Sequence, residues 1–237
     1  MLDPINTIQA INRTLEPFLV KGEGGNFYLK KYKSQNTFRL NVLGEYSLAY
    51  NDYGNHGEEV KVVKWFDDYW LFIEILFIYR EEFNKNTERE KKYLKLKDVN
   101  AKKQDTKISL SIFQGNETDN IKNQLFRAEW DDYGELNNNH PQPHWHFYTN
   151  KFIERTITSF ADIVSTEIQD SFKEVLNDEK RKIVDLTKFH FAMNGDWYNA
   201  TTHTHSITNE ESIARWFGGL LAHIKNELNY LENKRGR

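Results

Sequence analysis

The stretch VKVVKWFDDYWLFIEILFIY, residues 60–79, predicts the centre of the fold. Aromatic and β-branched residues dominate residues 60–66 and 69–79, and such residues favour strands. Only Asp67 and Asp68 separate the two runs, so a tight hairpin is expected. The second run is apolar on both faces, which is typical of a strand covered from both sides. We therefore expect it to form a central, buried strand.

Similar runs of aromatic and β-branched residues lie on either side of this hairpin along the chain. Turn-prone segments rich in Gly, Asn, Asp and Ser separate them. Together they predict a mostly antiparallel β-sheet over about residues 26–148. The runs are FYLKKY (27–32), TFRLNVL (37–43), YSLAY (46–50), KISLSIF (107–113), NQLFRAEWD (123–131) and HWHFY (144–148).

A helix is predicted near the start of the sequence. Asp3 followed by Pro4 is typical of an N-cap with proline at the first helical position. Apolar residues then recur every three or four positions, as on one face of a helix. These residues are Ile5, Ile8, Ile11, Leu15 and Leu19.

After the last predicted strand the pattern changes to that of helices. Apolar residues recur at helical spacing over residues 157–172 and 213–231. Thr208 with Glu211 forms a capping-box signature before the second of these segments. We expect these C-terminal helices to pack on the sheet.

These elements together predict an α+β fold, with an N-terminal helix, a mostly antiparallel sheet and C-terminal helices. No internal repeat or flexible linker interrupts the chain, so a single α+β domain over residues 1–237 is the simplest description. The alternative is a division into a sheet part, residues 1–152, and a helical part, residues 153–237.

Composition excludes several classes of site. The 237 residues contain no cysteine, which excludes disulfides, thiolate metal ligands and a cysteine nucleophile. The most apolar run, residues 70–79, has roughly half the ~20 residues that a membrane-spanning helix needs. The N-terminus also lacks the order of charged and apolar regions found in signal peptides. We therefore expect a cytoplasmic protein without a membrane span.

Charge and motifs narrow the function classes further. The formal net charge of −3 argues against a surface that is basic throughout. The charge-dense segment 80–107 interleaves both signs and is typical of a solvated hairpin or loop, although clustered Lys and Arg could also contact nucleic acid. No phosphate-binding loop, nucleophile elbow or HExxH motif is present, which argues against ATPases, ordinary serine hydrolases and zincins.

The stretch HPQPHWHF, residues 140–147, brings histidines into a predicted strand. Successive side chains of a strand point to opposite faces, so in HWHF (144–147) both histidines share one side and both aromatics the other. The same alternation separates polar from apolar residues in the strand over 123–131. If the two strands pair in the register that puts aromatics together, the ionisable residues share one polar face. These residues are Arg127, Glu129, Asp131, His144 and His146.

A metal site is one interpretation of this polar face. Two histidines two positions apart on a strand can bind one ion, and a neighbouring carboxylate can complete the set. The expected cofactor is then a divalent metal such as zinc or manganese. The HTH sequence at 203–205 repeats the spacing. The candidate metal ligands are His140, His144, His146, His203 and His205.

Metal-free cleavage of phosphodiester bonds is a second interpretation of the same residues. Histidine passes a proton in either direction near neutral pH, Glu129 can orient it, and Arg127 can stabilise negative charge on phosphorus. In a third interpretation the polar residues coat a solvated sheet face and the histidines are structural. The residues alone leave these alternatives open.

The segment FRAEWDDYGELNNNHPQPHWH, residues 126–146, resembles the core pattern of the TumE-type toxins of prokaryotic toxin–antitoxin systems. In that pattern an aromatic-Arg-x-Asp-like strand precedes a histidine-rich segment, and the resemblance covers about residues 125–148. It implies a toxin-like, RNA-directed active site. The residues that it assigns to this site are Arg127, Asp131, His144 and His146.

Two alternative functions are therefore expected. The first is a toxin- or defence-type effector with a histidine-rich, nuclease-like site that acts on RNA or DNA phosphodiesters. Its partner would be a protein, either an antitoxin or a complex subunit, in addition to the nucleic acid. The alternative is a non-catalytic subunit of a multi-protein prokaryotic defence or toxin–antitoxin assembly.

Overall fold

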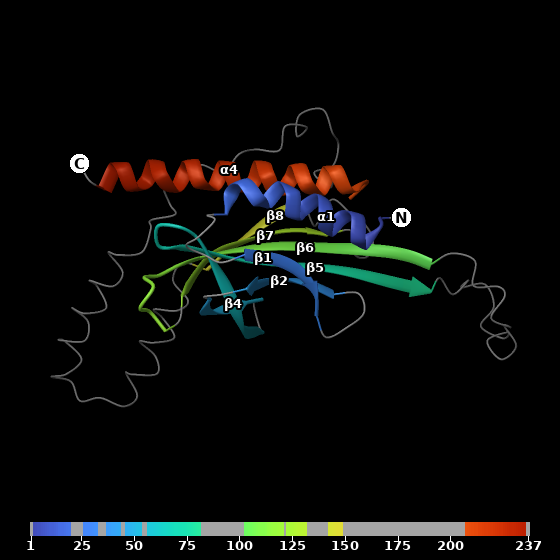
Figure 1. Ribbon diagram of the computed structural model, residues 1–237, viewed down its shortest axis with the longest axis horizontal. Coiled ribbons are helices and arrows are strands. Elements are labelled where there is room, and N and C mark those ends of the chain that lie inside the picture. Colours follow the sequence, from blue (N-terminus) through green and yellow to red (C-terminus); the bar gives the residue numbers. More distant parts are fainter. Residues whose placement is uncertain are drawn as a thin grey trace, which may run out of the picture.

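The structure, a computed structural model, describes residues 2–19, 26–32, 37–43, 46–53, 56–81, 102–120, 122–131, 142–148 and 207–235. It shows the predicted α+β fold, with an N-terminal helix, an eight-stranded sheet and a C-terminal helix (Figure 1). The helices are α1 (Pro4–Leu15), the 3-10 helix η1 (Glu16–Phe18) and α4 (Glu210–Arg235). The strands are β1 (Asn26–Lys31), β2 (Thr37–Leu43), β3 (Ser47–Asp52), β4 (Gly57–Phe66), β5 (Tyr69–Glu81), β6 (Lys102–Gln114), β7 (Asn123–Asp131) and β8 (His144–Phe147).

Strand β5 is the centre of the sheet. On one edge, β6 pairs with it along its full length of 13 residues. The other edge is shared, because β4 pairs with the start of β5 and β2 with its middle. Asp67 and Asp68 form the turn from β4 to β5, and Asp67 has a φ of 45°, which Asp tolerates better than most residues. The predicted hairpin and central strand are confirmed.

The named strands pair antiparallel in the order β1-β2-β5-β6-β7-β8, while β3 and β4 lie off this path. Strand β3 pairs with β4, which in turn pairs with β5. An isolated bridge also joins Ala49 of β3 to Lys122, just before β7. Strands β3 to β7 thereby form a ring that closes over one face of the sheet.

The other face of the sheet is covered by α1 and α4, which lie side by side along it (Figure 1). Alternate residues of β5 point toward these helices and meet the apolar faces of both, so the main core lies between the sheet and the helix pair. Its fully buried members include Ile11, Leu15, Leu71, Ile73, Ile75, Phe77, Phe217, Leu221, Ile224 and Leu228.

The N-terminal helix begins as predicted, but one of the apolar residues at helical spacing is exposed. The side chain of Asp3 accepts hydrogen bonds from the N–H groups of Ile5 and Asn6. Ile5, the first of the apolar residues at helical spacing, is 66% exposed. The buried side of α1 includes Ile8 and Ile11. At about 100° per residue, Ile5 lies about 60° from Ile8 around the helix axis, on the side away from Ile11.

The C-terminal helix begins with a different cap from the one predicted. The side-chain oxygen of Asn209, not that of Thr208, accepts the N–H of Ser212 at 2.8 Å. Asn209 directly precedes Glu210, the first helical residue, so it occupies the position from which a side chain reaches the third helical N–H. The predicted capping box is therefore wrong by one residue.

The ring of β3 to β7 buries polar groups on the face opposite the helices. Asn51 accepts hydrogen bonds through Oδ1 from Ser111 at 2.8 Å and from Gln124 at 3.0 Å. The N–H of Asp52 donates to Gln124 Oε1 at 2.7 Å. A small apolar cluster lies beside this network and consists of Ala49, Val60, Val62, Trp70, Phe72 and Phe113. Strand β3 therefore covers part of the second face.

Some predictions concern residues outside the described ranges. The helix expected over 157–172 and the division near residue 152 fall there. The charge-dense segment 80–107 is described only at its two ends, where the last residues of β5 pair with the first residues of β6. Both strands reach further into this segment than the sequence predicted.

Substitution of Ile73 tests whether β5 is the core of the fold. Ile73→Ala removes methyl and methylene groups from a fully buried side chain, so we expect the free energy of unfolding to fall by about 2–5 kcal/mol. Urea denaturation measures this change. The matched control is Ile5→Ala, at an exposed position, where a change within about 0.5 kcal/mol is expected. Equal effects of the two substitutions would contradict the central placement of β5.

Candidate functional site

Strands β7 and β8 pair in the register predicted from the alternation of aromatic and polar residues. Phe126 lies opposite Phe147, Ala128 opposite Trp145, Arg127 opposite His146, and Glu129 opposite His144. Phe126 and Trp145 contact each other with ring centroids 5.5 Å apart. The ionisable side chains therefore share the face of the sheet that the helices do not cover.

The two aromatic residues of HWHF differ in burial. Phe147 is 48% exposed, whereas Trp145 is partly buried and packs against the main core. Among the described strands, β8 is the last in the sheet order, and it has only four residues. The aromatic half of HWHF is thus only partly in the core.

The polar face continues across the sheet as a row of paired positions. Each member lies directly opposite the next on the neighbouring strand, which brings charged groups from distant parts of the chain into line. The row runs from β2 to β8 through Arg39, Glu74, Ser109, Glu129 and His144.

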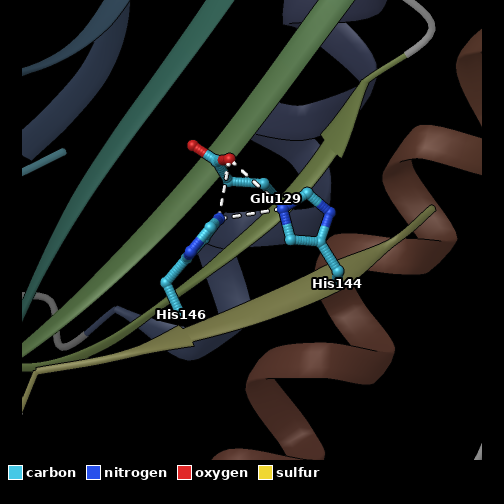
Figure 2. A group of neighbouring side chains, drawn as sticks. All are labelled: Glu129, His144 and His146. Carbon is cyan, nitrogen blue, oxygen red and sulfur yellow. Dashed lines mark hydrogen bonds and ion pairs between the residues drawn. The ribbon is translucent and has the colours of Figure 1, made fainter. Parts of the chain in front are cut away.

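Glu129, His144 and His146 converge on one point (Figure 2). Nε2 of His144 lies 2.8 Å from Nε2 of His146. Oε2 of Glu129 lies 3.2 Å from Nε2 of His146 and 3.5 Å from Nε2 of His144. The Glu129 side chain is 5% exposed, that of His144 15% and that of His146 39%. A buried carboxylate thus lies beneath two imidazoles, of which His146 is the more accessible.

The second oxygen of Glu129 faces two cations. Oε1 lies 2.8 Å from Nε of Arg127 and 3.2 Å from Nζ of Lys107. Burial alone raises the pKa of Glu129, but the hydrogen bond with His144 and the charges of Arg127 and Lys107 outweigh it and hold that pKa well below its usual range. Glu129 is therefore an anion at neutral pH. Partial burial lowers the pKa of His146, and the Arg127 charge adds to this effect, although Glu129 opposes it.

Arg127 is held from several sides and is only 4% exposed. Its Nη1 donates to the carbonyl oxygen of Asp52 at the end of β3. Its guanidinium lies 4.6 Å from the ring centroid of Tyr53 and 5.5 Å from that of Tyr148. These contacts orient the guanidinium toward Glu129 and not toward solvent, which favours a supporting position over direct contact with a substrate.

The remaining predicted residues are placed differently. Asp131 ends β7 on the same face, but its carboxylate is not among the converging donor atoms; its N–H donates to Gln142 Oε1 at 3.0 Å. His140, His203 and His205 lie outside the described residues. The structure thus brings together Arg127, Glu129, His144 and His146 of the predicted set.

The sequence did not lead us to predict that Lys107 and the end of β3 contribute to the site. Lys107, Ser109 and Ser111 alternate with apolar residues in β6, and this period-2 pattern was a signal that Lys107 shares the face of Glu129. Asp52 and Tyr53 reach Arg127 only because β3 folds over the sheet. No local pattern indicated that contact.

A second charged group lies next to the site. Arg39 forms ion pairs with Glu58 and Glu74, and the hydroxyl of Tyr53 donates to Glu74 Oε1 at 3.5 Å. Burial, together with the charges of Glu74 and Glu58, raises the pKa of Tyr53, so its hydroxyl stays protonated. The ring of Tyr53 therefore lies between the two charged groups. Glu74, an acid within an otherwise apolar strand, is paired.

Comparisons of the chain with protein-family models, with curated proteins and with solved structures found no match. The resemblance to TumE-type toxins therefore stays a prediction. Helix α4 has 26 residues but carries many charges. Within the described ranges, no helix is both long and apolar enough to cross a membrane.

Removal of the Arg127 guanidinium tests its contribution to stability. Arg127→Met leaves the buried carboxylate of Glu129 without this ion-pair partner and the Asp52 carbonyl without this donor, so the free energy of unfolding should fall by about 3–5 kcal/mol. The double variant Arg127→Met/Glu129→Gln should lose less, because the buried negative charge is also gone. Chemical denaturation measures both.

The matched control for this test is Arg215→Met. Arg215 pairs with Glu211 at 3.9 Å on the surface of α4, where both side chains are more than 70% exposed (73% and 78%), so a change within about 0.5 kcal/mol is expected. If Arg127→Met were no more destabilising than this control, the Arg127–Glu129 pair would not be a buried structural contact.

Proposed function

We propose that this protein is a toxin- or defence-type effector that cleaves phosphodiester bonds of RNA or DNA at Glu129, His144 and His146. The observation that carries this proposal is the convergence of the two imidazole Nε2 atoms and Oε2 of Glu129 within 3.5 Å of one another. Convergent groups of this kind, on a face with accessible members, are typical of catalytic sites.

The charges around the cluster suit an anionic substrate. Cleavage of a phosphodiester requires groups that position the attacking oxygen and stabilise negative charge on the phosphoryl oxygens. The half-exposed Lys107 lies beside Glu129 and can contact a phosphate, while Arg127 adds a second positive charge from below. His146, whose side chain is 39% exposed, presents the most accessible nitrogen of the cluster.

In this proposal the protein acts in the cytoplasm, where RNA and DNA substrates are present. An effector of the toxin or defence type also needs a protein partner, either an antitoxin or a further complex subunit, to restrain or direct it. The TumE-like pattern at residues 126–146 supports the same class of activity. In the alternative, a non-catalytic subunit of a multi-protein assembly, the two histidines would serve only to support structure.

Substitution of the histidines tests the proposed activity. We expect purified protein to cleave labelled single-stranded RNA or DNA in buffer with and without Mn²⁺ or Zn²⁺. His144→Ala and His146→Ala should each lower the rate at least about 100-fold, because each removes a group that acts on the reacting phosphate. Gel-resolved cleavage time courses measure the rates.

The matched control is His56→Ala, at an exposed histidine in the turn between β3 and β4, which should cleave at the wild-type rate. Circular dichroism verifies that each variant is folded. Equal cleavage by wild type and both cluster variants would contradict the proposal. Absence of cleavage by the wild type, under every buffer condition, would favour the alternative of a non-catalytic subunit.

A further inference from the structure

We propose that Glu129, His144 and His146 bind one divalent transition-metal ion, of which Zn²⁺ is the preferred member. The three donor atoms are Oε2 of Glu129 and Nε2 of each histidine. Binding is a property of these atoms and stands whatever the substrate is. Only the use of the ion as a cofactor rests on the proposed nuclease function.

The distances between the donors fit a single ion. Their separations are 2.8, 3.2 and 3.5 Å. Metal–ligand bonds to imidazole and carboxylate are about 2.0–2.2 Å, so two ligands of one ion lie roughly 2.8–3.6 Å apart for bond angles between 90° and 109°. Ligand side chains therefore require little movement to reach coordination distance.

Hydrogen bonds alone satisfy this arrangement poorly. Each neutral imidazole carries one N–H, and at the contact between the two Nε2 atoms only one of them can donate. Oε2 of Glu129, an acceptor, faces the same point. A cation at that point accepts a lone pair from all three atoms at once.

The surroundings of Glu129 favour coordination through one oxygen. Arg127 and Lys107 both lie at Oε1, which fixes the carboxylate and leaves Oε2 directed at the histidines. Outer contacts of this kind orient metal ligands and are part of functional metal sites. The Tyr53 and Tyr148 rings in turn hold Arg127 in place.

The ligand set indicates both the class of metal and the type of site. Two imidazoles and one carboxylate suit Zn²⁺, Mn²⁺, Fe²⁺ or Co²⁺, whereas Mg²⁺ and Ca²⁺ prefer sets built from oxygen. Zn²⁺ binds most tightly of these four ions to such ligands. Three protein ligands with an accessible His146 leave a coordination position for water or substrate, as in catalytic and not in structural zinc sites.

The positive charge of Lys107 is expected to weaken the binding of a cation at this site. Arg127 and Lys107 together outweigh the single charge of Glu129, so a cation binds against a positive local field. Arg127 is buried and structural, but Lys107 is half-exposed and can be replaced with little effect on packing. Lys107→Gln should therefore tighten metal binding by about tenfold, while loss of any ligand weakens it.

Titration of the chelator-treated, full-length protein tests the inference without any activity assay. Competition with a chromophoric chelator should give a Zn²⁺ site that Mg²⁺ does not occupy. Glu129→Gln, His144→Ala and His146→Ala should each weaken Zn²⁺ binding more than the roughly 10- to 100-fold typical of outer contacts. Co²⁺ should show visible absorption in the wild type that His146→Ala loses. His56→Ala, the matched control, should bind as the wild type.

Three results would overturn the inference. The first is a wild-type protein that has no Zn²⁺ site. The second is Zn²⁺ affinity in the triple variant Glu129→Gln/His144→Ala/His146→Ala equal to that of the wild type. The third is weaker Zn²⁺ binding by Lys107→Gln, to the same extent as after loss of a ligand, which would place the ion at Lys107 or elsewhere.

The outcomes also separate this inference from the proposed nuclease function. Zn²⁺ binding at the three residues without cleavage of RNA or DNA would support the inference and contradict the proposed function. Cleavage by metal-free protein at the full rate, combined with no Zn²⁺ site, would do the reverse.

Discussion

The burial of β5 on both faces is the constraint on which the rest of the structure depends. Strand β5 has 13 residues, and its first ten are apolar except for Glu74, so it needs cover from two sides at the centre of a sheet. Helices α1 and α4 cover one side, and β3 with β4 covers part of the other. The two sides are covered differently. Apolar helix faces cover one side, and a β-hairpin with buried polar groups covers part of the other.

The candidate site lies where the second cover reaches β7. The end of β3 supplies the carbonyl of Asp52 and the ring of Tyr53, which hold Arg127, and Arg127 faces Glu129. The geometry of Glu129 therefore depends on a hairpin that is far from it in the chain. A buried charge held this way is costly to leave without its partner, which makes the site part of the stability of the sheet.

The sequence predicted much of the fold because its signals were local. Turn residues at Asp67 and Asp68, period-2 alternation around Glu129 and the cap at Asp3 each act over a few residues. Alternation also predicted which ionisable side chains share a face. The fold of β3 over the sheet and the contact of Arg127 with Asp52 depend on long-range packing, which no local pattern encodes.

The residues of the candidate site belong to two strands that differ in length and in pairing. Glu129 belongs to β7, which is paired on both sides, whereas both histidines belong to β8, a four-residue strand that comes last in the order of the described strands. Short edge strands open locally at a lower free energy than central ones. The imidazoles can thus separate from the carboxylate while the sheet stays folded. A ligand that binds the imidazoles and the carboxylate at once would therefore hold β8 against β7, and local opening of β8 would limit how often the site is assembled.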